Sequence, residues 1–291
     1  MNRKTVIILL LVCVSSFAEA QNFFSWQQND RYFSTYIGTG RTGYIGELTH
    51  RPLVNGLSHI NIGVEARLFT RIAARVQVTK YKIEGFDRDA ADSSANKQRN
   101  LAFTSKNWEV VLQGVYYFHK YGGKYHKRKL YEPYLAFGVG KTTYNPKTEL
   151  DDITYNLRDY QTEGIAYDKS TYILPLNFGV KGKLNEFMSL TLDLGFRFTF
   201  SDYLDDVSQN FIQHPEPSIS GSLADRSNEI PIANQEAFDN FIPGEKRGND
   251  AKYDKYFIIN LYLEFYLPRD LFKRNIGRIR KEKIIGKPGA Y

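Results

Sequence analysis

The densest group of side chains that could bind a ligand follows a stretch of alternating residues that ends near position 200. Asp202, Asp205 and Asp206 place three carboxylates within five positions. Hard cations such as Ca²⁺ take several oxygen ligands, so this spacing could form a calcium site. The segment 204–254, which begins here, has ten acidic and four basic residues. The alternative is an acidic loop that faces solvent, and the sequence favours that alternative.

Two glycine-rich segments resemble nucleotide-binding motifs but lack the context these motifs need. The glycines at 38, 40 and 43 fit G-x-G-x-x-G, yet the following residues 44–47 do not begin the apolar helix whose amino end would hold a pyrophosphate. Gly140-Lys141-Thr142 resembles the end of a phosphate-binding loop, but position 135 is not a glycine. We therefore expect no cofactor, and we expect the first three glycines to ease a strand into a loop.

The histidines give no sign of zinc or of an active site. The five histidines are scattered, without the H-x-x-x-H spacing or the cysteine partners of a zinc site. Some membrane-embedded enzymes modify lipid A with a His-Ser pair, and Ser58-His59 is the only adjacent pair in this chain. Nothing else marks a nucleophile, so we expect a protein that is not an enzyme.

A further group of charged residues lies in the middle of segments in which apolar and polar residues alternate. Such charges need partners if their face is closed off from bulk water. We predict that they form one network inside the protein, consisting of Glu65, Arg67, Arg75, Glu109, Lys181, Asp193, Arg197 and Glu264.

The alternation predicts the elements that carry these charges. In 190–201, leucine and phenylalanine alternate with small, polar and charged residues, which is the period of a β-strand. The clearest segments exceed the usual five or six residues of a strand but match a tilted strand that crosses a bilayer. Eight such segments are expected, at roughly 31–39, 60–68, 72–83, 107–119, 131–144, 174–181, 190–201 and 257–267.

The connections alternate in length. Short turns are expected at 70–71, 120–130 and 185–186, and long loops at 40–57, 84–106, 145–171 and 204–254. An even number of strands with short turns on one side and long loops on the other is typical of outer-membrane proteins. The predicted fold is all-β: an eight-stranded antiparallel up-and-down transmembrane β-barrel, integral to the outer membrane, with extracellular loops, periplasmic turns and both termini in the periplasm. A soluble antiparallel sandwich is the alternative, but there the polar face with its mid-strand charges would meet bulk water. In a closed barrel that face lines the lumen, where charges of opposite sign can pair.

Eight strands enclose a space just wide enough for side chains to fill. With Lys183 added to the network above, five basic side chains would face four acidic ones. We therefore expect a lumen that is plugged by paired charges and conducts no solutes.

The two ends of the chain differ from the barrel in composition. Residues 1–20 have a basic start, an apolar run and an Ala-Glu-Ala cleavage site, which predicts a signal peptide before a barrel at 21–267. The single cysteine, Cys13, lies in that peptide, so no disulfide is expected. Residues 268–291 carry a charge of +6 and are predicted to be a basic periplasmic tail. Its docking residues would be Lys273, Arg274, Arg278, Arg280, Lys281 and Lys283.

Four segments, in this order, resemble the PorG-like outer-membrane barrels of Bacteroidota: Tyr44–Leu48, Gln98–Phe103, Tyr131–Gly138 and Thr199–Val207. The last is the most specific, and the resemblance covers roughly residues 30–210. It implies a non-enzymatic component of type IX secretion, in some members also of gliding motility. In that family the barrel is thought to tie a periplasmic lipoprotein-containing ring to the outer membrane. The long 204–254 loop departs from the family's pattern, and the tail matches no family motif.

Three functions stay open at this point. The first is a docking subunit of type IX secretion, which would bind periplasmic ring proteins through the turns 120–130 and 185–187 and the tail, with membrane lipid around it and no nucleic acid. The second is a surface adhesion or ligand-binding barrel that uses the loop 204–254. The third is a lipid A-modifying enzyme, for which the sequence offers no nucleophile.

Overall fold

The computed structural model of this 291-residue chain describes residues 32–48, 53–90, 95–120, 128–215, 217–229, 243–249 and 253–267. The predicted signal peptide and the predicted basic tail lie outside these residues. No helix within them is long and apolar enough to span a membrane.

Eight strands form a closed antiparallel barrel in which each strand pairs with its neighbours in sequence. The barrel closes where β10 pairs with β1 from Phe33↔Leu267 to Ile45↔Lys255. The barrel strands are β1 (Phe33–Ile45), β2 (His59–Arg67), β3 (Ile72–Phe86), β4 (Ala102–Tyr117), β5 (Tyr131–Thr143), β8 (Ser170–Lys183), β9 (Met188–Thr199) and β10 (Lys255–Leu267). The predicted up-and-down barrel is confirmed.

The barrel is apolar outside and polar inside. Along β9 the leucines and phenylalanines are exposed, whereas Thr191, Asp193 and Arg197 on the alternate positions are buried. Exposed aromatic rings also gather near both ends of the strands. Those near the short turns are Tyr116, Phe118, Tyr131 and Phe187, and those near the long loops are Tyr172, Phe198, Phe200 and Tyr253. An apolar band between two aromatic girdles is the surface of a barrel embedded in a bilayer.

The strand β1 runs six residues beyond the expected end, to Ile45. The glycines at 38, 40 and 43 therefore lie within a strand and do not ease it into a loop. A Cβ atom at Gly38 would come within 2.3 Å of the Tyr262 ring, so this glycine makes room for a tyrosine that fills the lumen. The alternation of hydrophobic residues alone could not predict that the strand continues to Ile45, because the glycines interrupt the alternation.

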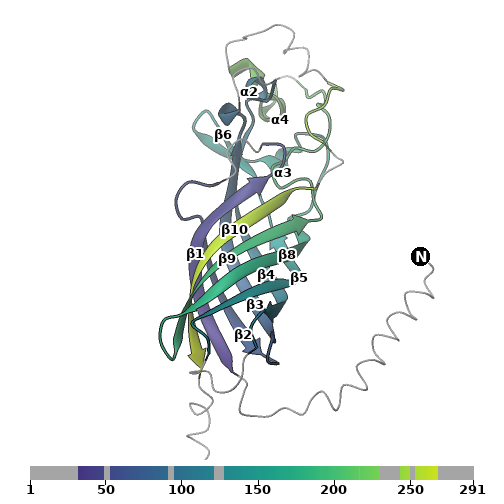
Figure 1. Ribbon diagram of the computed structural model, residues 1–291. Helices are drawn as coiled ribbons and strands as arrows, with labels where there is room; N and C mark the ends of the chain where they lie inside the picture. The colour runs from purple at the N-terminus through teal and green to yellow at the C-terminus, as the bar shows by residue number, and fades with distance from the viewer. Residues whose placement is uncertain are drawn as a thin grey trace, which may run out of the picture.

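The four long connections gather at one end of the barrel and fold together, and we call their described residues within 46–58, 87–101, 144–169 and 200–254 the cap (Figure 1). The cap contains η2 (Asp87–Asp89), α2 (Ala95–Arg99), the hairpin β6 (Lys147–Leu150) and β7 (Ile153–Asn156), α3 (Leu157–Tyr160), α4 (Ile219–Ala224) and η4 (Ser227–Glu229). Its apolar core includes Leu48, Leu101, Leu157, Leu204, Val207 and Leu223.

The prediction that the acidic segment 204–254 faces solvent is wrong for 204–208, Arg247 and Asp254, which are buried, but it holds for other described residues such as 243–246, which are exposed. Leu204 and Val207 are at most 1% exposed, and Asp205 and Asp206 are buried beside them. A charge count over this segment could not predict this outcome, because Asp206 is paired with Arg247, 41 positions away, and accepts hydrogen bonds from Thr162 and Tyr167 of another connection.

Candidate functional site in the lumen and the cap

The first of two polar groups in the lumen is centred on Glu65. Its carboxylate accepts hydrogen bonds from Arg75 Nη2 at 2.8 Å and from Lys181 Nζ at 2.9 Å. Lys181 Nζ also binds Glu264 Oε1 at 2.8 Å, and the Tyr117 hydroxyl donates to Glu65. These side chains come from five strands, so the group ties opposite walls of the barrel together.

The second group lies nearer the cap. Arg197 Nε lies 3.0 Å from Glu109 Oε2, and the Tyr256 hydroxyl donates to the same oxygen at 2.5 Å. Asp193 accepts from Tyr134, Asn177 and Asn260 at 2.6–2.8 Å. Arg75 Nη1 lies 3.9 Å from Asp193 Oδ2 and so connects the two groups.

Arg67 lies at the turn end of the lumen and contacts the first group through the Tyr117 ring. Its guanidinium stacks on the Tyr117 ring, 3.7 Å from the centroid, and Nη2 is 4.0 Å from Glu132. Nearby, buried Arg128 donates to the backbone carbonyls of the 185–188 turn at 2.8 Å. Glu132 and Arg128 were not in the predicted network. Glu132 could have been found, because it occupies one of the alternate positions of β5 that face the lumen. Arg128 precedes that strand, so no alternation of residues marks it. Lys183 is only half-buried.

The geometry of the lumen therefore indicates that these charged residues stabilise the barrel. Each of the eight predicted network residues is buried and has an ion-pair or hydrogen-bond partner within the described part of the chain. Paired charges and tyrosine rings fill the space that a pore would need.

Ser58 and His59 do not form a catalytic pair at the lipid face. His59 is buried on the lumen side of β2. Ser58 Oγ instead accepts from Thr42 N at 2.7 Å and bonds to Thr42 Oγ1 at 2.8 Å.

The cap is held by a buried arginine that sequence reasoning missed. Arg247 Nη1 binds Glu163 Oε1 at 2.9 Å, and Arg247 Nη2 lies 3.6 Å from Asp206 Oδ2. Asp206 also accepts from the hydroxyls of Thr162 and Tyr167 at 2.5 and 2.6 Å. Burial raises the pKa of Asp206, and the Arg247 charge lowers it. Asp206 is therefore fully engaged within the cap and is not available to a metal ion.

We expect an Arg247→Ala variant to loosen the cap while the barrel stays folded. Removing this guanidinium leaves Glu163 and Asp206 buried without their cation, which costs about 3 kcal/mol. Limited proteolysis in detergent micelles should cut the cap at least ten times faster than in the wild type. Arg226→Ala is the matched control, because its Glu229 partner is partly exposed. Equal cleavage rates in the two variants would contradict the prediction.

The other two aspartates of the predicted calcium site lie elsewhere, in a group of carboxylates where the cap meets the barrel. Carboxylate oxygens of Glu47, Asp202 and Asp254 lie within 4.8 Å of one another. Asp205 lies beside them, and burial followed by the Glu47 charge raises its pKa well above the usual range. Burial and then Asp205 raise the pKa of Asp254 in the same way. Glu47 and Asp254 were missed because they are distant from Asp202 in sequence.

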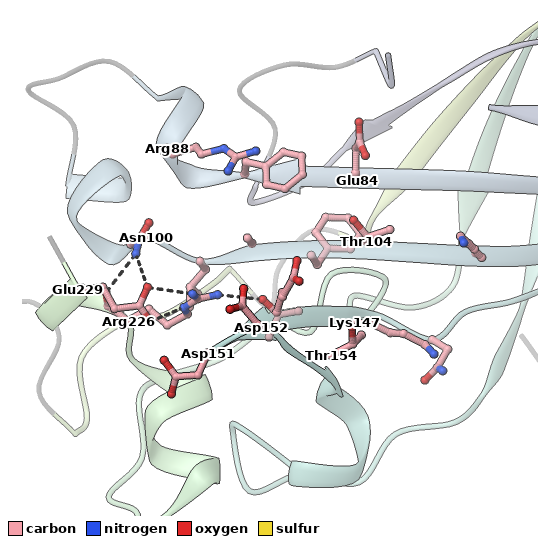
Figure 2. A pocket seen from close by; sticks show the side chains of 18 of the residues that line it. Glu84, Arg88, Asn100, Thr104, Lys147, Asp151, Asp152, Thr154, Arg226 and Glu229 are labelled. Atoms are coloured by element: carbon pink, nitrogen blue, oxygen red, sulfur yellow. Dashed lines mark hydrogen bonds and ion pairs between the residues drawn. The ribbon is translucent and has the colours of Figure 1, made fainter. Parts of the chain in front are cut away.

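A groove of about 1060 Å³ opens on the side of the cap, between the ends of β3 and β4, the β6–β7 hairpin and η4. Figure 2 shows Arg226 paired with Glu229, three residues further along the same segment, and Glu229 also accepts from Asn100. Arg226 Nη1 also donates to Thr148 at 3.0 Å. Charged side chains of both signs line the groove: Lys82, Glu84, Arg88, Lys106, Lys147, Glu149, Asp151, Asp152, Arg226 and Glu229.

Three of the four segments that resemble PorG-like barrels meet at the base of the cap. Tyr44 and Leu48 of the first segment share one apolar cluster with Leu101 and Phe103 of the second. Leu204 and Val207 of the fourth belong to the same cluster. These residues are therefore explained by the packing of the cap onto the barrel.

Comparison with known proteins adds the family. No curated protein matches the chain. Solved structures similar to it include the Neisserial surface protein NspA (10% identity, 81% of this chain and 96% of that one, TM-score 0.39). A major outer membrane protein of Thermus thermophilus shows 14% identity over 81% and 99% of the two chains, with a TM-score of 0.38. The attachment invasion locus protein Ail of Yersinia pestis shows 7% identity over 82% and 99%, with a TM-score of 0.37.

One family model covers residues 3–214, which is most of the chain. The description of that family names no activity, so the resemblance to PorG-like barrels stays a prediction. The chain belongs to the family described as a domain of unknown function, DUF6089.

Proposed function

We propose that this protein is a non-enzymatic outer-membrane barrel that acts as a structural and docking component of type IX protein secretion. The observation that carries the proposal is the lumen, where ion pairs such as Arg197–Glu109 fill the interior. A barrel filled in this way works through its surfaces, because it offers no path for a solute. The secretion role in this proposal is supported by the resemblance of four segments to PorG-like barrels.

The two ends of the barrel suit different tasks. Phe33 pairs with Leu267 at the end opposite the cap, so the described chain enters and leaves the barrel there. In our proposal this end faces the periplasm and the cap faces outward, as short turns and long loops do in outer-membrane barrels. The docking surface for a periplasmic secretion ring would then combine the turns 120–130 and 185–187 with the basic tail 268–291.

A clean deletion of the gene, followed by mass spectrometry of surface, medium and periplasm, tests the secretion role. We expect proteins that bear type IX sorting domains to accumulate in the periplasm, and the wild-type gene to restore their export. An Arg247→Ala copy should restore export too, since the cap is not the docking surface. Normal export in the deletion strain would overturn the proposal.

The groove on the cap favours a second candidate, a barrel that binds a ligand at the cell surface. Removing the whole segment 204–254 would also remove buried Leu204 and Arg247. A cleaner test reverses the charges of Arg88 and Lys147 in the groove, which should abolish surface binding while secretion stays normal.

A further inference from the structure

The junction between the cap and the barrel contains more buried negative charge than its surroundings neutralise. Glu47 follows β1, Asp202 and Asp205 follow β9, and Asp254 precedes β10. Asp205 and Asp254 are each 1% exposed and Asp202 is 6% exposed. Carboxylates are almost never buried in this way unless they are paired or coordinate a metal ion.

The cation whose charge acts on this group is already engaged elsewhere. Arg99 is the cation whose charge acts on both Glu47 and Asp205. Its Nε and Nη2 bind the Asp87 carboxylate at 2.7 and 2.9 Å, and its Nη1 donates to the carbonyl of Arg247 at 2.5 Å. One guanidinium that already neutralises Asp87 cannot balance four further carboxylates.

Unused acceptor atoms point to a missing ligand. Asp205 Oδ2 is buried and accepts no hydrogen bond from the described residues, and the same holds for Glu47 Oε2. The other oxygen of Asp205 accepts from Val207 N at 3.0 Å. The Tyr44 hydroxyl donates to Asp254 Oδ1 at 2.5 Å and also faces Asp205, so the two carboxylates share one side of the cluster.

We propose that Glu47, Asp202, Asp205 and Asp254 form a binding site for a divalent cation, with Ca²⁺ the ion that fits it best. All four ligands offer hard carboxylate oxygens, and no imidazole or thiolate is among them, which disfavours zinc and copper. Ca²⁺ accepts six to eight oxygens in an irregular arrangement, whereas Mg²⁺ demands a regular octahedron and usually keeps several waters with only one or two carboxylates.

The site differs from the one the sequence predicts. Asp202 and Asp205 belong to it, but Asp206 is held by Arg247 and two hydroxyls and is replaced by residues from two other segments. An ion bound here would join the end of β1, the end of β9 and the start of β10. It would therefore fasten the cap to the barrel rim.

The test uses the full chain, folded in detergent micelles and freed of metal with EDTA. Calorimetric titration with CaCl₂ should give one ion per chain, with at least tenfold weaker binding of MgCl₂. Bound Tb³⁺, a Ca²⁺ analogue, should luminesce when tyrosine is excited, because the Tyr44 hydroxyl touches the cluster. Added Ca²⁺ should slow proteolysis of the cap at least tenfold.

Asp254→Asn and Asp205→Asn should each weaken Ca²⁺ binding at least tenfold. In EDTA the Asp205→Asn variant should resist proteolysis better than the wild type, because it removes one repelling charge while its amide oxygen can still accept from Val207 N. Asp151→Asn, at an exposed residue of the β6–β7 turn, is the matched control and should bind Ca²⁺ as the wild type does. The absence of stoichiometric Ca²⁺ binding by the wild type would overturn the proposal, whatever the variants do. Wild-type affinity in Asp254→Asn would overturn it as well.

Discussion

An Arg197→Met variant should lose about 3–5 kcal/mol of unfolding free energy, the largest effect we expect from one substitution in the barrel. Arg197 and Glu109 are both fully buried, and the guanidinium makes three contacts of 3.0–3.2 Å with the carboxylate. Methionine fills much of the space but leaves Glu109 charged in a medium that solvates it poorly. Urea titration of the folded barrel in lipid vesicles measures the loss. Trp108 is exposed on the lipid side and can report unfolding by its fluorescence.

A double variant separates loss of the ion pair from loss of packing. Arg197→Met combined with Glu109→Gln removes the unpaired charge while the amide oxygen still accepts from Tyr256. It should therefore recover most of the lost stability. Lys82→Ala is the control, because Lys82 is 36% exposed in its pair with Glu84 and such pairs contribute at most about 1 kcal/mol. If Arg197→Met were no more destabilising than this control, the lumen network would not hold the barrel together.

The barrel could be predicted because its signal is local. In β9 each residue's neighbours two positions away share its face, so twelve residues are enough to reveal an apolar outside and a polar inside. The same parity places Glu65, Asp193 and Arg197 in the lumen before any partner is known. It does not give the pairing, since Lys181 reaches Glu65 from 116 positions away.

The cap could not be predicted because its signal is not local. Arg247 finds Glu163 and Asp206 across 84 and 41 positions, and no period in the sequence connects them. The carboxylate cluster is similar, since Glu47 and Asp254 lie at opposite ends of the chain and meet only because β1 pairs with β10. One signal was present: two of the segments that resemble PorG-like barrels, Tyr44–Leu48 and Thr199–Val207, each carry acidic residues of the cluster.

Replacing the six basic residues of the predicted docking tail with glutamine should reduce co-purification of a periplasmic partner at least tenfold. The residues are Lys273, Arg274, Arg278, Arg280, Lys281 and Lys283. They lie in a segment with a charge of +6, while residues 21–267 are neutral overall. A concentrated basic segment attracts an acidic surface, and removing it abolishes that attraction. The measurement is quantitative mass spectrometry after purification of the tagged barrel from membranes.

The end of β10 explains why the tail that follows it in sequence would act together with a turn. Tyr266 N donates to the carbonyl of Phe187 at 2.8 Å, so β10 ends against the 185–187 turn. A partner bound to the tail would therefore reach the turn as well. Exchanging each lysine for arginine and each arginine for lysine in the tail keeps the charge and is the matched control. Because exposed charges are screened by salt, binding by wild type and control should fall as salt rises, whereas the glutamine variant should show little further change. Full partner recovery with the glutamine variant would show that the tail is only a solvated end.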